Sequence, residues 1–374
     1  MTRRALVATT IPLTAHKFYG ELIDELRGRG FEVHLVTSDG PEIPRLRQRV
    51  DAVHVVEMSR TISLSADARS LVRWVRTLRR VRPQLVLAGT PKAGLLGMIA
   101  ARLVGVPSRA YLLQGLRLEG TTGATRRVLG LMERIASWCS RRVIAVSPSL
   151  ARVYQDAGLN AGRPVVVGHH GGSHGVDSAF FTPRPRDAAT LTRFGLDPSL
   201  PVVLFVGRLT ADKGPHTLVA AMRMLRQRGV PVQLLVVGAQ DEGDSQRLLD
   251  QLRSESDSVR VLDHVDDVRP CYAASDVLVL PTLREGLPNV VLEAGAMGVP
   301  SVTTTATGAV DSVVHEQTGL LVPPEDPSAL ADALGRLLTD TELRDRLGAA
   351  ARERVVRDFQ PADVAAAIVT YALL

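Results

Sequence analysis

The sequence is poor in the residues that build disulfide frameworks and base-stacking platforms. Its 374 residues include two cysteines, Cys139 and Cys271, which are too few for a disulfide framework, and neither has metal-ligand spacing. We interpret both as buried apolar thiols. Aromatic residues make up only 4% of the chain and no nucleic-acid-binding motif is present, so we predict no nucleic-acid partner.

Long apolar runs are missing as well. The most apolar stretch, residues 93–106, is interrupted by Arg102 and is shorter than the roughly 20 residues of a membrane-spanning helix. The apolar start, residues 5–11, is followed by Pro12 and lacks a clear signal-peptide cleavage site. We therefore expect a buried first strand, no transmembrane segment, and a cytoplasmic protein.

Lysine is scarce among the 45 basic residues, which include only Lys17, Lys92 and Lys213. All three follow predicted strands, where the ligand loops of parallel sheets lie, and this indicates one shared cleft. The charge is divided unevenly, because residues 1–177 carry 26 basic and 13 acidic side chains whereas residues 178–374 carry 19 and 26. The basic half predicts contact with phosphate groups or an anionic membrane surface.

Short apolar runs alternate with amphipathic stretches along the whole chain, which is typical of βα units on parallel sheets. We therefore predict the α/β class, with two doubly wound sheets facing each other across a cleft. The predicted strands are residues 5–9, 32–37, 53–56, 84–88, 109–113, 142–146 and 165–167, and then 202–206, 233–237, 259–262, 277–280, 301–304 and 319–322.

A helix is predicted over residues 66–81. Its inward face carries Leu71, Val75 and Leu78. The opposite side is an arginine face, which is either an ordinary solvated surface or part of a membrane-facing patch. It consists of Arg69, Arg73, Arg76, Arg79 and Arg80.

Proline-rich irregular sequence divides the chain into two domains. We predict an N-terminal acceptor-side domain over residues 1–180, a linker over 181–200 and a second domain over 201–358. The final segment, residues 359–374, is predicted to be a helix that returns to the first domain.

The first chemical motif follows the strand at 202–206. Gly207 allows a close backbone approach, and the cations Arg208 and Lys213 come before a helix. A planar guanidinium and a compact ammonium suit a diphosphate. A strand, turn and helix with surface charges would look the same.

The second motif follows the strand at 277–280. Its glycine-containing loop holds Glu285, and Pro288 suits the first turn of a helix that carries Glu293. The helix start favours an anion, and each carboxylate can accept two hydroxyl hydrogen bonds. The set fits a nucleotide sugar, although acids at a helix start also occur without a ligand.

Together these segments resemble the retaining glycosyltransferases of the GT-B fold, in the fourth sequence family, which includes many bacterial polysaccharide and glycolipid enzymes. Arg208 and Lys213 match its first motif, and Glu285 and Glu293 match its Glu-x7-Glu signature. The likeness extends over nearly the whole chain, through residues 91–97, 100–107, 172–180 and 318–327. The resemblance implies two Rossmann-like domains and sugar transfer from a nucleotide diphosphate sugar with retained configuration.

The resemblance also implies roles for individual residues. Arg208 and Lys213 would hold the donor diphosphate, Glu285 would contact the transferred sugar, and Glu293 would bind the ribose. Amides near Glu285 would cover the sugar and phosphate, together with Gly207 on the first loop. These amides belong to Gly286, Leu287 and Asn289, with Pro288 between them. No metal and no other cofactor is expected, because cations and a helix dipole would stabilise the leaving diphosphate.

Two positions depart from the family pattern. Gln114 stands where many members carry a histidine that contacts the donor sugar, and His174 stands where many carry an asparagine. Gln114 cannot titrate, so the site would not rely on imidazole there. We further expect residues in the cleft on the acceptor side, namely Thr14, His16, Lys17 and Lys92, with a surface-loop position as the alternative.

Two clusters invite a metal interpretation that we do not favour. The histidines at 169, 170 and 174 lack a fourth ligand, and the acidic groups at 241–244 and 266–267 look like helix-start charges.

We predict a hexosyltransferase that uses a UDP-sugar and a lipid-linked saccharide or polyprenyl-diphosphate acceptor, with peripheral membrane contact through the basic half. One alternative is tailoring of a small secondary metabolite. Others are a nucleotide-sugar epimerase and a silent nucleotide-sugar-binding protein.

Overall fold

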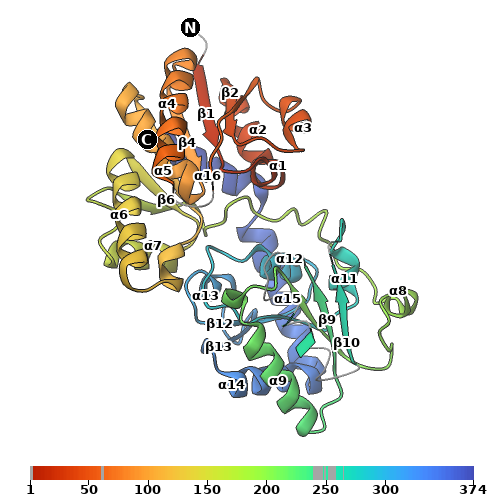
Figure 1. Ribbon diagram of the computed structural model, residues 1–374. Coiled ribbons are helices and arrows are strands. Elements are labelled where there is room, and N and C mark those ends of the chain that lie inside the picture. Colours follow the sequence, from red (N-terminus) through yellow and green to blue (C-terminus); the bar gives the residue numbers. More distant parts are fainter. Residues whose placement is uncertain (1–2, 60–62, 239–246, 248–249, 252–257, 264) are drawn as a thin grey trace. The chain divides into compact units, whose positions relative to one another are not determined.

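The computed structural model describes residues 3–59, 63–238, 247, 250–251, 258–263 and 265–374 (Figure 1). The chain divides into two compact units. The first unit comprises Met1–Gly175 and Pro361–Leu374, and the second comprises Val176–Gln360. Each unit contains one sheet whose strand pairs among the described residues are all parallel.

The first sheet has seven strands in the order β3-β2-β1-β4-β5-β6-β7. Its central strands are buried on both faces, as the continuous apolar runs of β1 and β4 require. The strands are β1 (Arg3–Ala8), β2 (Phe31–Thr37), β3 (Ala52–Val55), β4 (Leu85–Gly89), β5 (Ser108–Leu113), β6 (Arg142–Ala145) and β7 (Val165–Val167).

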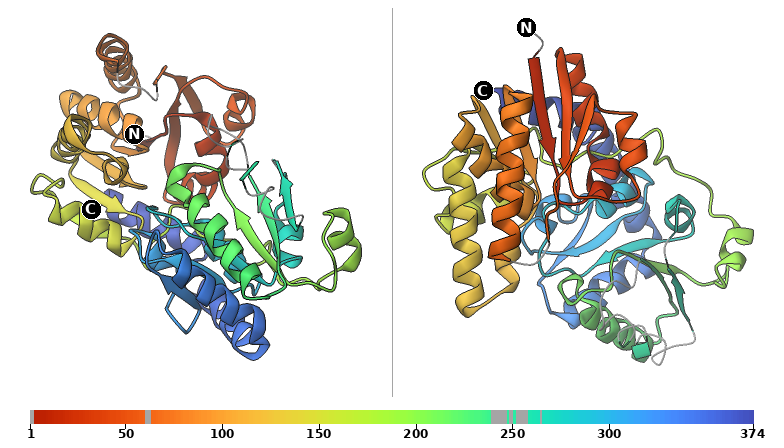
Figure 2. Two further views of the ribbon diagram at one scale, coloured as in Figure 1. Left: turned by 60° about the horizontal axis from the view of Figure 1, so that its bottom comes forward. Right: turned by 45° about the horizontal axis from the view of Figure 1, so that its top comes forward.

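Helices cover both faces of the first sheet (Figure 2). One layer consists of α4 (Leu64–Val81), α5 (Pro91–Val104) and α6 (Gly123–Cys139), and the other contains α2 (Gly20–Gly28) and α16 (Pro361–Leu373). The other described helices of this unit are α1 (Pro12–Phe18), α3 (Ile43–Arg47) and α7 (Pro148–Asp156). A short 3-10 turn, Arg117–Gly120, precedes α6.

The second sheet has six strands in the order β10-β9-β8-β11-β12-β13. The strands are β8 (Val202–Val206), β9 (Gln233–Val237), β10 (Val259–Leu262), β11 (Val277–Leu280), β12 (Ser301–Thr304) and β13 (Gly319–Val322). The strand order of both sheets reverses next to the first strand of the unit, as in doubly wound Rossmann folds. The predicted fold class is therefore confirmed.

Two helix layers also enclose the second sheet. One contains α9 (Pro215–Gln227) and α14 (Pro327–Thr339), and the other contains α12 (Asn289–Ala296) and α15 (Thr341–Asp358). The other described helices of this unit are α8 (Ala188–Arg193), α11 (Arg269–Ala273) and α13 (Ala309–Ser312).

The arginine helix α4 differs in detail from its prediction. Trp74, Leu78 and Val81 form its buried face, while Leu71 and Val75 are only half-buried. The large indole of Trp74 therefore determines which side of the helix faces the core. The observed buried face is rotated from the predicted one toward Trp74. All five arginines of the predicted arginine face are exposed.

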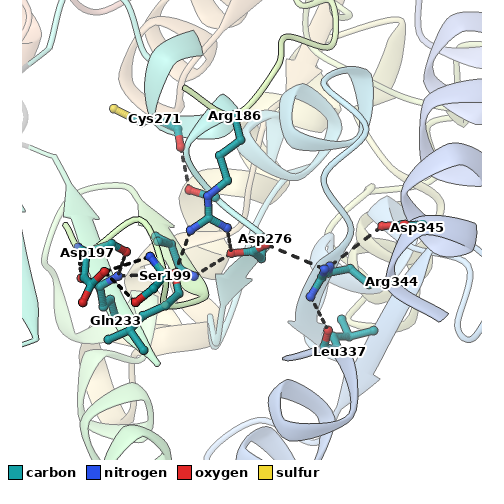
Figure 3. A network of polar contacts seen from close by, with 12 residues as sticks. Arg186, Asp197, Ser199, Gln233, Cys271, Asp276, Leu337, Arg344 and Asp345 are labelled. Carbon is teal, nitrogen blue, oxygen red and sulfur yellow. Dashed lines mark hydrogen bonds and ion pairs between the residues drawn. The ribbon is translucent and has the colours of Figure 1, made fainter. Parts of the chain in front are cut away.

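The predicted linker, residues 181–200, belongs to the second unit and contains α8. Figure 3 shows how polar contacts tie it to the sheet. Arg186 donates to Asp276 Oδ2 over 2.7 Å, and the same oxygen accepts the amide of Val202 at 2.7 Å. Gln233 and Asp197 exchange hydrogen bonds of 2.7 and 2.9 Å. These contacts lie where β8, β9 and β11 begin.

Membrane-spanning potential can be judged from helix length and hydropathy. Within the described parts of the chain, no helix combines the length and the apolar character that crossing a bilayer requires.

Candidate functional site

The two chemical motifs follow neighbouring strands of the second sheet. β8 pairs in parallel with β11, so the loops after Val206 and Leu280 leave the same carboxyl edge. Doubly wound sheets bind ligands at this edge. The predicted donor residues of both motifs therefore lie on adjacent loops.

The first loop turns sharply at Gly214. This residue has φ +70°, and a Cβ here would lie 1.9 Å from the carbonyl oxygen of Pro281. Only glycine fits, because any side chain would collide with the backbone of the second loop. The close approach fixes the spacing of the two loops immediately after Lys213.

Asp212 connects the same loops by hydrogen bonds. Its carbonyl oxygen accepts the amide of Leu283 at 2.8 Å and the hydroxyl of Thr282 at 2.9 Å. Its carboxylate accepts the hydroxyl of Thr210 at 2.5 Å and pairs with Arg284 at 3.2 Å. Burial opposes ionisation of this carboxyl, but the Thr210 hydroxyl and the Arg284 charge outweigh it and lower the pKa of Asp212.

Lys213 and Glu285 face each other across the two loops. Lys213 Nζ lies 2.5 Å from Glu285 Oε1, and the two side chains are 17% and 13% exposed. The backbone of Glu285 is held in turn by its amide, which donates to the carbonyl of Thr307 at 2.8 Å. The side chain predicted to bind the diphosphate and the side chain predicted to contact the sugar therefore form an ion pair with each other.

The second loop leads into the N-terminus of α12, with Pro288 as the N-cap and Asn289 as the first helical residue. The first turn contains no acidic side chain. The Oδ1 atom of Asn289 is buried and has no hydrogen-bond partner among the described residues. An unsatisfied buried acceptor costs free energy, so this atom is suited to a donor group from a ligand.

Glu293 lies one turn into α12. Its Oε2 atom accepts the hydroxyl of Tyr272 at 2.8 Å, and Tyr272 is fully buried on α11. Burial, reinforced by the negative charge of Glu293, raises the pKa of this phenol. The phenol therefore stays protonated and remains a hydrogen-bond donor that holds one carboxylate oxygen.

The structure brings most of the predicted donor residues to this one edge. Lys213, Glu285, Asn289 and Glu293 lie on the two loops and α12, with Leu287 buried between them. Arg208 is exposed, and its guanidinium makes no hydrogen bond or ion pair with a described residue. Gly207 and Gly286 contribute backbone to the same loops.

The predicted acceptor-side residues belong to the first unit. Thr14, His16 and Lys17 lie on α1, directly after β1, and Lys17 is exposed. Lys92, expected in the cleft, is buried and paired with both oxygens of Asp67 at 2.7 and 2.8 Å. Asp67 thus matches this charge within the unit.

Gln114 and His174 also have defined surroundings in the first unit. Gln114 follows β5, and its side chain lies beside Gly89. A Cβ added to Gly89 would lie 3.2 Å from Oε1 of Gln114 and 2.1 Å from the hydroxyl of Tyr19. The ring of His174 packs against Phe18 at 4.5 Å, and its Nδ1 is 2.8 Å from the hydroxyl of Ser173. Burial lowers the pKa of His174 to about 4, which keeps the ring neutral at pH 7.

The clusters considered for metal binding have other surroundings. His169 and His170 pack edge to face at 4.6 Å, and Asp267 pairs with Arg269 at 2.8 Å. The acidic residues at 241–244 lie outside the described residues. Among those that the structure does describe, no three His, Cys, Asp or Glu side chains are grouped to hold a metal ion.

Three residues of the site were missed in the sequence. Asp212 and Arg284 directly precede Lys213 and Glu285, so their places in the motifs were the available signal. Tyr272 had no such signal, because it lies 21 residues from Glu293 and meets it only through the packing of α11 on α12.

Comparison with known proteins agrees with this geometry. The model of the glycosyl transferases group 1 matches residues 200–340, and that of the glycosyl transferase 4-like domain matches residues 15–170. The capsular polysaccharide biosynthesis glycosyltransferase CapM of Staphylococcus aureus is 35% identical over 94% of this chain and 91% of its own.

A second relative is the UDP-Gal:alpha-D-GlcNAc-diphosphoundecaprenol alpha-1,3-galactosyltransferase of Escherichia coli. It is 28% identical over 88% of this chain and 85% of its own. Among solved structures, Anabaena HepE in complex with UDP and glucose superposes with a TM-score of 0.78 at 22% identity, covering 99% of each chain. The chain therefore belongs to the group 1 glycosyltransferases and is a bacterial-type glycosyltransferase of the GT-B fold.

Proposed function

We propose that this enzyme transfers a hexose or N-acetylhexosamine from a UDP-sugar to a lipid-linked saccharide or polyprenyl-diphosphate acceptor, with retention of configuration and without a metal ion. The observation that carries the donor assignment is the Lys213–Glu285 contact beside the N-terminus of α12. The Lys213 ammonium would bind phosphate, and the neighbouring Glu285 carboxylate would accept sugar hydroxyls.

The leaving diphosphate would be stabilised by charge rather than by covalent chemistry. Arg208 is exposed on the first loop and Lys213 lies on the same loop, while the amides at the start of α12 supply the positive end of a helix dipole. Such preorganised donors lower the barrier when charge develops on the leaving oxygen. The resemblance to retaining glycosyltransferases supports the proposed retention of configuration.

Glu293 is proposed to bind the ribose. One of its oxygens is fixed by Tyr272, so the carboxylate is oriented before the donor arrives. The buried Oδ1 of Asn289 would accept a hydroxyl of the donor. UDP as the nucleotide is supported by the UDP complex of HepE and by the name of the Escherichia coli relative.

The acceptor assignment is supported by the relatives and by the first unit. CapM acts in capsular polysaccharide biosynthesis, and the Escherichia coli relative is named for a diphosphoundecaprenol-linked sugar.

Helix α6 presents the exposed apolar side chains Val128, Leu131 and Trp138. Its only acidic residue, Glu133, is buried. Three exposed arginines, Arg126, Arg127 and Arg134, lie on the same helix. This face suits an anionic membrane surface.

Donor hydrolysis tests the proposal. Purified enzyme is incubated with a panel of UDP-, GDP- and ADP-sugars, and released nucleoside diphosphate is measured with and without diphosphoundecaprenol-linked N-acetylglucosamine. We expect slow hydrolysis of a UDP-sugar, faster turnover with the acceptor, and loss of both in Glu293→Ala. The matched control is Glu353→Ala on the exposed side of α15.

Two outcomes would contradict the proposal. Equal activity of wild type and Glu293→Ala would exclude the ribose role of Glu293. Conversion of one nucleotide sugar into its epimer without any acceptor, with the nucleotide still attached, would identify an epimerase instead.

A further inference from the structure

The two side chains proposed to bind diphosphate and sugar, Lys213 and Glu285, form an ion pair with each other. Lys213 Nζ lies 2.5 Å from Glu285 Oε1, and neither side chain makes another hydrogen bond or contact ion pair with a described residue. Both side chains are largely buried, at 17% and 13% exposure. A partly buried ion pair is costly to break when one charge is left uncompensated.

Resting on the function proposed above, we infer that the Lys213–Glu285 ion pair is exchanged for ligand contacts when the donor binds, and that Glu285 thereby discriminates the intact nucleotide sugar against the free nucleoside diphosphate. An intact donor offers both side chains a new binding partner, because its diphosphate binds Lys213 and its sugar hydroxyls hydrogen-bond to Glu285. A free nucleoside diphosphate binds Lys213 but offers nothing to Glu285, so the carboxylate loses its cation without gaining another partner.

The same exchange has a consequence after the reaction. Once the sugar has been transferred, Glu285 loses its hydroxyl partners and competes again with the diphosphate for Lys213. The recovered ion pair would weaken the binding of the product nucleotide and favour its release.

The surrounding loops allow this exchange without a large rearrangement. Asp212 bonds both loops through its carbonyl oxygen at 2.8 and 2.9 Å, and its carboxylate is already held by Thr210 and Arg284. The loops therefore stay joined when the ion pair opens. For the same reason, a Glu285 variant should retain the loop structure.

Isothermal titration calorimetry on the full-length protein tests the inference with UDP and with the UDP-sugar selected in the donor panel. Glu285→Gln removes the competing charge but keeps a side chain of the same shape that can still accept a hydroxyl. We expect this variant to bind UDP about tenfold more tightly than the wild type, which corresponds to about 1.4 kcal/mol. The preference for the UDP-sugar over UDP should fall by a similar factor.

A double-mutant cycle separates ion-pair exchange from simple charge repulsion between Glu285 and phosphate. If the carboxylate acts by occupying Lys213, adding Glu285→Gln to Lys213→Gln should tighten UDP binding by less than about threefold. A tenfold gain in the Lys213→Gln background would overturn the exchange, and so would an unchanged or weaker UDP affinity of Glu285→Gln alone.

The control is Glu316→Gln, which neutralises an exposed carboxylate of the same unit that pairs with Arg336 at 2.9 Å. It should leave the UDP affinity unchanged. The result also distinguishes the two proposals. A wild type that binds neither UDP nor the UDP-sugar contradicts the proposed function and this inference with it. Normal wild-type binding of UDP without the gain in Glu285→Gln contradicts the inference alone.

Discussion

A single phenol holds the carboxylate that is proposed to bind the ribose. The hydroxyl of Tyr272 donates its single hydrogen to Glu293 at 2.8 Å and also lies 3.3 Å from the carbonyl oxygen of Val290, and the side chain is fully buried. Because its hydroxyl reaches a side chain and a backbone group of α12, it positions Glu293 relative to the helix without touching the ligand itself.

We therefore predict that Tyr272→Phe raises the KM for the donor about fivefold to tenfold and changes kcat little. One hydrogen bond to a charged group is lost, while the ring still fills its place in the core. Steady-state kinetics with varied donor measures the effect. Tyr371→Phe, a substitution in the first unit, serves as the control, and an unchanged KM in Tyr272→Phe would remove its positioning role.

At this scale the sequence indicated the candidate residues of the two loops more readily than the residues that support them. Arg208, Lys213, Glu285 and Glu293 could be chosen because each stands in a local motif after a strand. The partner of Lys92 could not be chosen, because Asp67 lies 25 residues earlier and only the packing of α4 on α5 brings them together.

The candidate site and a stabilising polar network lie at opposite ends of the strands of the second sheet. The donor loops follow the carboxyl ends of β8 and β11, whereas Asp276 lies just before β11 and bonds Arg186 and the first residue of β8 (Figure 3). The network anchors the segment that contains α8 to the start of the sheet.

We predict that Asp276→Ala lowers the free energy of unfolding by about 2–3 kcal/mol, because the buried amide of Val202 loses its acceptor and Arg186 loses its partner. Donor hydrolysis by the folded variant should be unchanged. Urea unfolding followed by circular dichroism measures the change. Asp332→Ala, which breaks an exposed pair with Arg228, should cost less than about 1 kcal/mol. Equal costs for the two variants would contradict a structural role for the network.

The elements themselves were largely predictable. Every predicted strand lies within two residues of an observed one, because buried parallel strands are short apolar runs with clear ends. The segment at 181–200 was harder, since its prolines suggested a linker while Asp197 and Arg186 are anchored by residues far along the chain.

The net positive charge of the molecule is concentrated in the first unit, where residues 1–175 and 361–374 carry 26 basic and 13 acidic side chains. Part of this charge surrounds exposed apolar side chains. Trp138 on α6 is 51% exposed and Arg102 of α5 stacks on its ring at 3.8 Å, while Leu131 is 59% exposed. A tryptophan and arginines on one surface are typical of membrane interfaces.

We predict that the protein co-sediments with vesicles containing phosphatidylglycerol at low salt and less at high salt, and that the double variant Leu131→Glu, Trp138→Glu reduces binding at least tenfold. Added acids oppose the anionic surface and remove apolar area. Val356→Glu, an exposed position of the second unit, should bind as the wild type does. Absence of vesicle binding at low salt would instead favour an acceptor in free solution.

The last helix has a consequence for how the chain is made. α16 contributes Val364, Ile368 and Val369 to the interior of the first unit and packs against β4, β5 and β6. During ribosomal synthesis, residues 1–175 emerge before the second unit but lack this cover until residues 361–374 have been made. The first unit is therefore completed only after the second, and one of its apolar faces stays uncovered while residues 176–360 are synthesised.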